Sequence, residues 1–101
     1  MIKHIVVWKL LDETPQHGSK AQAAIKGKAL LEGLLGTVPT LRKAEVGING
    51  NPDTSNFDLV LSSEFDDWAG LHAYVEHPAH KLVAQFIGEI RSDRSAVDYE
   101  F

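Results

Sequence analysis

The sequence predicts an α+β fold in which four strands form one antiparallel sheet and two helical segments cover one face of it. Strand-like and helix-like stretches follow one another in the order βαββαβ. The two most apolar strands, residues 2–11 and 57–65, are the first and third, and these take the central positions in a sheet of this order.

Residues 2–11, IKHIVVWKLL, are rich in β-branched and aromatic side chains and predict the first strand. One face of this strand carries Ile2, His4, Val6, Trp8 and Leu10. The opposite face includes Ile5 and Val7 and is also substantially apolar, whereas a strand covered on one side only should alternate more cleanly. Both faces therefore need cover.

Residues 20–36, KAQAAIKGKALLEGLLG, predict the first helix, which Gly36 and Pro39 should end. Its apolar residues at helical spacing are Ala24, Ile25, Leu31, Leu34 and Leu35. Gly27 and Gly33 lower its intrinsic helix propensity. Packing against the rest of the chain should therefore hold this helix.

Residues 41–50, LRKAEVGING, predict a second, more polar strand, and a turn-rich loop, NPDTSN, separates it from the third. A helix with Asp66 or Asp67 as N-cap should follow, and its apolar stripe is Trp68, Leu71 and Val75. Pro78 interrupts this helix because it lacks an amide donor. The helix then resumes over 78–91 with the apolar stripe Leu82, Val83, Phe86, Ile87 and Ile90. Residues 94–101, RSAVDYEF, predict the fourth strand.

This order predicts a single ferredoxin-like domain over residues 1–101, with helices on one face of the sheet. The other face has no helical cover, although Ile5, Val7 and their neighbours place apolar side chains on it. A face of this kind usually marks an association surface. Twofold pairing of two such sheets would hide both, so we expect a homodimer.

Composition excludes several classes of partner and chemistry. The formal charge is −4, from 10 basic and 14 acidic residues, which argues against a nucleic-acid partner. The chain has no cysteine, so disulfides and thiolate chemistry are excluded. No apolar run approaches the roughly 20 residues that span a bilayer, and the start of the chain has the pattern of a strand and not of a signal peptide. We expect a cytoplasmic protein without a membrane partner.

The stretch AYVEHPAHK, residues 73–81, concentrates the candidate functional residues. His77 and His80 lie on either side of Pro78, and Tyr74 lies three residues before His77. A metal site made by these histidines with His4 is disfavoured, because a proline splits an i, i+3 pair where helical ligands are normally spaced i, i+4. The histidines can instead be reactive groups, or they can simply fix the helix break.

Several segments resemble the stress-responsive dimeric α/β-barrel (Dabb) family over nearly the whole chain. They are IKHIVVWKL, FDLVLSSEF, LHAYVEHPAHKLV and AVDYEF. The resemblance implies a ferredoxin-like subunit whose sheet joins that of a second copy to form a barrel. It implies no cofactor and no metal.

One plant member of the family, olivetolic acid cyclase, closes a linear tetraketide by aldol condensation with a tyrosine and a histidine from this segment. Matching the motif assigns those positions to Tyr74 and His80, with His77 and His4 matching two further histidines. His80 would then be the general base, since neutral imidazole is available near pH 7, and Tyr74 the hydrogen-bond donor to an enolate oxygen. Pro78 can turn His80 towards Tyr74, and Trp8 can line the cavity beside His4.

The chain departs from the cyclase in its first helix. Its only tyrosines are Tyr74 and Tyr99, and the region around Leu31 is aliphatic where the cyclase has a pocket tyrosine. The resemblance therefore implies a small apolar pocket and polyketide cyclase-like lyase chemistry on a small carbonyl compound, with a different pocket shape. Two alternatives stand beside it: a non-catalytic stress or small-molecule-binding dimer, and, by fold analogy alone, a cofactor-free monooxygenase.

Overall fold

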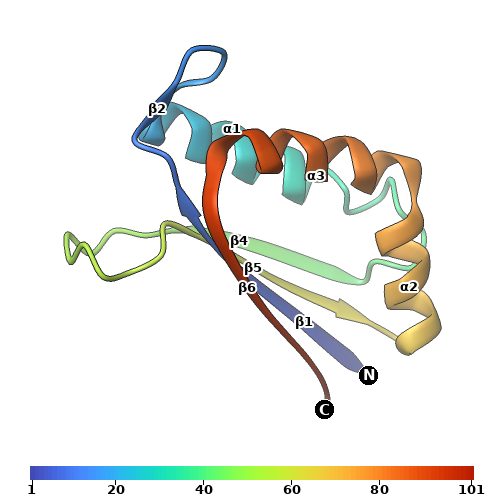
Figure 1. The fold of residues 1–101 in the computed structure, drawn as a ribbon. Helices are drawn as coiled ribbons and strands as arrows, with labels where there is room; N and C mark the ends of the chain where they lie inside the picture. Colours follow the sequence, from blue (N-terminus) through green and yellow to red (C-terminus); the bar gives the residue numbers. More distant parts are fainter.

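The computed structural model describes residues 1–101 as one four-stranded antiparallel sheet with three helices on one face (Figure 1). The strands of this sheet are β1 (Ile2–Leu10), β4 (Lys43–Ile48), β5 (Leu59–Phe65) and β6 (Arg91–Glu100), in the spatial order β4-β5-β1-β6. The helices are α1 (Lys20–Glu32), α2 (Trp68–Glu76) and α3 (Pro78–Ile90). The predicted order and the central positions of β1 and β5 are confirmed.

Side chains on β1 alternate strictly between the two faces of the sheet. Every second residue from Ile2 to Leu10 is buried under the helices, and the residues between them are only half-buried. The helix-facing side belongs to one core of 20 buried hydrophobic residues, which also includes Leu59, Phe65, Tyr74 and Ile90. The β1 alternation predicted from the sequence therefore decides which side chains enter the core.

The helices begin at residues whose side chains satisfy free backbone amides. Ser19 caps α1 in a reciprocal capping box with Gln22. Asp67, one of the two predicted candidates, caps α2 by accepting a hydrogen bond from the Gly70 amide at 2.7 Å. The chain before α1 also contains a short hairpin, β2 (Glu13–Thr14) and β3 (Gly18–Ser19), which the sequence did not predict.

Pro78 ends α2 and starts α3, as predicted. His77 between the two helices is extended, with ψ 135°, as the residue before a proline prefers. Pro78 then occupies the first position of α3, where its missing amide removes no helical hydrogen bond. The corner places His80 in the first turn of α3, next to the last turn of α2.

Several residues predicted to lie in apolar stripes are exposed instead. Only part of each stripe is buried, and the rest remains in solvent. The exposed members are Ile25, Leu35, Trp68, Val75 and Leu82. The core positions of α2 and α3 are taken by Leu71, Tyr74, Val83, Phe86, Ile87 and Ile90.

No helix covers the other face of the sheet. Ile5 and Val7 lie there beside Val60 of β5 and Val97 of β6, and Val97 is 55% exposed. Every residue of β6 is exposed. We call this surface the open face. None of the helices is long and apolar enough to cross a membrane.

We expect Gly27→Leu to lower the free energy of unfolding by about 1–3 kcal/mol, as overpacking of a core usually does. A Cβ atom at Gly27 would already lie 3.3 Å from Ile87 Cδ1 and 3.4 Å from Leu59 Cδ2. The matched control is Gly88→Leu on α3, where a Cβ meets nothing within 4 Å. There the better helix propensity should raise stability by roughly 0.5–1 kcal/mol. Urea denaturation measures the free energy of unfolding of each variant. Equal changes in the two variants would contradict the close packing of α1 on α3.

Candidate functional site

A cavity of about 150 Å³ lies between the helix-facing side of the sheet and the helices. Its lining comes from β1, β5, β6 and all three helices: His4, Val6, Trp8, Leu31, Leu61, Tyr74, His80, Ala84, Ile87, Arg91 and Arg94. The two arginines are exposed and belong to the edge strand β6, so they mark the mouth of the cavity. The structure thus brings together four of the predicted residues, His4, Trp8, Tyr74 and His80.

Tyr74 is 1% exposed and forms part of the core. Burial raises the pKa of its phenol to about 12, and no hydrogen bond contributes to that shift. Every polar side-chain atom that is sealed from solvent has a hydrogen-bond partner. The unpaired Tyr74 hydroxyl is therefore one that the cavity reaches, and it stays protonated at neutral pH.

His80 is fixed in one tautomer by the end of α2. Its Nδ1 lies 3.1 Å from the Val75 carbonyl oxygen, and because a carbonyl can only accept, Nδ1 carries the hydrogen. In the neutral ring, Nε2 then keeps its lone pair. Desolvation, and next the nearby charges of His4 and Arg94, lower the pKa of His80 despite the opposing hydrogen bond to Val75. The ring is thus a neutral base at physiological pH.

The aromatic rings of the site pack closely together. The ring centroids of Tyr74 and His80 are 4.5 Å apart, and those of His4 and Tyr74 are 6.3 Å apart. Phe65 lies against both Tyr74 and His4, at 5.1 and 6.5 Å between centroids. This packing holds the phenol between the two imidazoles.

His4 is buried, and its Nδ1 hydrogen-bonds a carboxylate oxygen of Asp98 on β6. Asp98 lies directly across from His4 in the β1–β6 register. A carboxylate can only accept, so His4 donates from Nδ1 and Asp98 sets the orientation of the ring. His4, Tyr74 and His80 therefore form one polar cluster inside the cavity, apart from the two arginines at its mouth.

His77 does not line the cavity. Its Nδ1 accepts a hydrogen bond from the Ala79 amide at 3.0 Å, so its imidazole caps α3 in the way that a serine or aspartate usually does. No group of three His, Asp or Glu side chains in the chain is arranged to hold a metal ion.

Sequence reasoning missed three polar residues of the site, Asp98, Arg91 and Arg94. The signal for two of them was available in the last strand, where Arg94 and Asp98 share a face by alternation. Their approach to His4 and Trp8 depends on the pairing register of β6 with β1. That register is a tertiary feature, and the sequence alone did not specify it.

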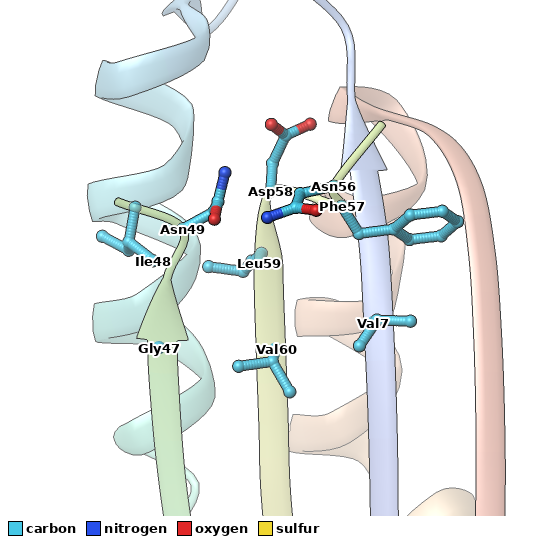
Figure 2. Close-up of a pocket in the computed structure, with 9 residues that line it drawn as sticks. All are labelled: Val7, Gly47, Ile48, Asn49, Asn56, Phe57, Asp58, Leu59 and Val60. Atoms are coloured by element: carbon cyan, nitrogen blue, oxygen red, sulfur yellow. The ribbon is translucent and has the colours of Figure 1, made fainter. Parts of the chain in front are cut away.

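A second hollow, of about 310 Å³, lies on the open face over the ends of β4 and β5. Figure 2 shows Gly47, Val60 and Val7 on neighbouring strands, with the Phe57 ring beside β1 and the helices behind the sheet. Its one carboxylate, Asp58, already binds the Leu10 amide and lies 3.5 Å from Lys20 Nζ. This hollow offers an apolar surface without a free acid or base.

Comparison with known proteins connects this geometry to one family. The model of the stress responsive A/B barrel domain matches residues 2–101. An uncharacterized protein of Streptomyces coelicolor, SCO4036, is 32% identical over 101 residues, which is the full length of both chains.

Solved structures share the fold. A dimeric protein of unknown function from Bacteroides fragilis, described as ferredoxin-like, is 36% identical, with a TM-score of 0.87 over 99% of this chain and 95% of the other. A hydroxynitrile lyase from Passiflora edulis is 16% identical, with a TM-score of 0.80 over 97% and 90% of the two chains. At that identity the second likeness shows the fold alone. The family model, by contrast, matches residues 2–101, and this match establishes that the chain belongs to the stress responsive A/B barrel domain family.

Proposed function

We propose that this protein performs cofactor-independent acid/base chemistry on a small carbonyl compound in the cavity beneath its helices. His80 is the general base, Tyr74 is the hydrogen-bond donor, and His4, held by Asp98, orients the bound molecule. The observation that carries the proposal is the pairing of a neutral imidazole with an unpaired, buried phenol, 4.5 Å apart between ring centroids, in one cavity.

The proposed reaction is an intramolecular aldol or related cyclisation. Nε2 of His80 takes a proton from the carbon next to a carbonyl, and the electron pair of that C–H bond moves to give an enolate. The Tyr74 hydroxyl donates a hydrogen bond to the enolate oxygen. The enolate carbon then forms a bond to a second carbonyl carbon, and the imidazolium of His80 returns the proton to the resulting alkoxide.

The surroundings of both groups suit these roles. A phenol whose pKa is about 12 donates a hydrogen bond without losing its proton. The lowered pKa of His80 keeps its ring neutral and ready to accept a proton near pH 7. The apolar walls formed by Val6, Leu61 and Ile87 exclude bulk water and strengthen these interactions.

A fold relative named as a hydroxynitrile lyase adds support, because it shows that this fold can carry a lyase. The second candidate function is a non-catalytic binding protein. The capping hydrogen bond of His77 and the His80–Val75 hydrogen bond favour it, since both also stabilise the helix corner.

We expect Tyr74→Phe to lower turnover by about 10²–10³-fold, because it removes the donor and keeps the packed ring. His80→Ala should lower it by roughly 10²–10⁴-fold through loss of the base. The measurement is the exchange of α-protons of small ketones and β-keto esters for deuterium in D₂O, monitored by proton NMR. His72→Ala, at an exposed position on α2, is the control and should leave the rate unchanged.

These variants also separate the two candidate functions. If His80→Ala lowers only the melting temperature, and the wild-type protein exchanges no α-proton above the buffer rate, the binding role replaces the catalytic one.

The pH dependence should follow the lowered pKa of His80. Exchange should rise as His80 loses its proton, with a midpoint below the ordinary value of 6.5, and should not fall again near neutral pH, since Tyr74 ionises only near pH 12. The titratable and charged groups that line the cavity with this ring are His4, Tyr74, Arg91 and Arg94, and Asp98 hydrogen-bonds His4. NMR titration of the His80 Cε1 proton measures the pKa directly; a midpoint at or above 6.5 would contradict the assigned environment.

We further propose that the functional unit is a homodimer joined through the open face. Ile5, Val7, Val60 and Val97 form the apolar centre of that face, and two hollows of about 310 Å³ each lie on it. The related structure from Bacteroides fragilis is described as dimeric. A second copy would cover these side chains and fill the hollows.

Val97→Asp should shift the protein from dimer to monomer, because pairing would bury an unpaired carboxylate. The matched control is Leu82→Asp on α3, which is 71% exposed on the helical side of the molecule. Size-exclusion chromatography with light scattering at micromolar concentration distinguishes the two. A monomeric wild-type protein, or equal dissociation of both variants, would overturn the assignment of the open face.

A further inference from the structure

Two arginines at the mouth of the cavity lack acidic partners. Arg91 and Arg94 line the cavity from the start of β6, and neither forms an ion pair in the structure. The remaining arginine, Arg42, directly precedes β4, at the edge of the sheet opposite β6. It binds Asp66 through two nitrogens, at 3.1 and 2.9 Å. Only the arginines at the cavity are free.

The nearest acidic residues on β6 are engaged elsewhere or point away. Asp98 shares a face with Arg94, but it hydrogen-bonds His4 and lies four residues, or about 13 Å, further along the strand. Asp93 lies opposite Lys9 in the register, on the open face. A chain with a formal charge of −4 therefore has a locally positive cavity mouth.

Arg94 lines the same cavity as His80. It is one of the causes that lower the pKa of His80, so the guanidinium is close enough to interact with groups bound beside that ring. The register places Arg94 opposite Trp8, whose side chain also lines the cavity. Ala96, between Arg94 and Asp98 on the same face, is small and leaves the approach open.

We propose that Arg91 and Arg94 bind a carboxylate of the substrate, so that the cavity takes a small carbonyl compound with an anionic end. The reactive carbon enters between Tyr74 and His80, and the carboxylate stays at the mouth. A guanidinium fork matches the planar carboxylate through two parallel hydrogen bonds. This assignment rests on the proposed chemistry for the position of the reacting carbon, whereas the carboxylate site itself does not depend on it.

Substrate binding at this site would also activate the base. A bound carboxylate offsets the positive charge of Arg94, which weakens one of the effects that keep the pKa of His80 low. The imidazole would thus become more basic when a substrate is present. His4 and the desolvating walls would continue to act on the ring as before.

The test uses benzoate and its uncharged counterpart benzamide as probes, with isothermal titration calorimetry of the full chain at about 50 mM salt. We expect benzoate to bind at least about tenfold more tightly than benzamide, the ratio expected from a charge-assisted hydrogen bond. Arg94→Gln should remove this preference, Arg91→Gln should reduce it, and neither should change benzamide binding. NMR should show the midpoint of the His80 titration rising on addition of benzoate.

Lys43→Gln is the matched control, because it removes an exposed lysine of β4 that forms no ion pair and does not line the cavity. It should leave the benzoate preference intact. Equal binding of the two probes, binding of neither up to 10 mM, or an unchanged preference in Arg94→Gln would overturn the carboxylate site.

The variant His80→Ala separates this inference from the proposed chemistry. It should keep the preference for benzoate because His80 does not hold the anion. A wild-type protein that prefers benzoate and exchanges no α-proton would retain the carboxylate site and lose the catalytic proposal. A protein that exchanges the α-protons of neutral ketones but does not prefer benzoate would retain the catalytic proposal and lose the carboxylate site.

Discussion

The site depends on one hydrogen bond at the corner between α2 and α3, from Nδ1 of His80 to the carbonyl of Val75. The last turn of a helix leaves carbonyls without intrahelical partners, and Pro78 ends α2 at this point. His80, in the first turn of α3, satisfies the free carbonyl of Val75 across the break. The same bond fixes its tautomer, so that Nε2 of the neutral ring keeps its lone pair. The end of α2 and the tautomer of His80 thus depend on the same local arrangement.

Burial imposes opposite demands on the two groups of the pair. It raises the pKa of the Tyr74 phenol and lowers that of the His80 imidazole, so both remain neutral over a wide pH range. A charged group at either position would need a compensating partner in the apolar wall. His4 has Asp98 as its hydrogen-bond partner, and the charged arginines stay at the exposed mouth. The neutral polar groups Tyr74 and His80 therefore lie inside the cavity, and its permanently charged groups lie at the mouth.

The sequence was sufficient to predict the order of strands and helices and the break at Pro78, because periodicity and proline geometry act locally. The grouping of His4, Tyr74 and His80 was expected only from the resemblance to the family, since it joins segments far apart in the chain. Asp98 was missed since its approach to His4 depends on strand pairing, which includes a register shift between Lys9 and Leu10. The exposure of Ile25 and Leu82 was missed for a related reason. Helical spacing identifies an apolar stripe, but which members of the stripe are buried depends on how the helix is oriented in the packed structure.

Strand β1 links the cavity to the proposed dimer interface. Its even-numbered residues, among them His4, Val6 and Trp8, line the cavity, while Ile5 and Val7 between them form the centre of the open face. A slip of one residue in pairing would exchange the two sets and destroy both surfaces. A partner that covers the open face would therefore also hold β1 in the register that presents His4 to Asp98. In the proposed dimer, packing on one side of the sheet would therefore stabilise the arrangement of the cavity residues on the other side.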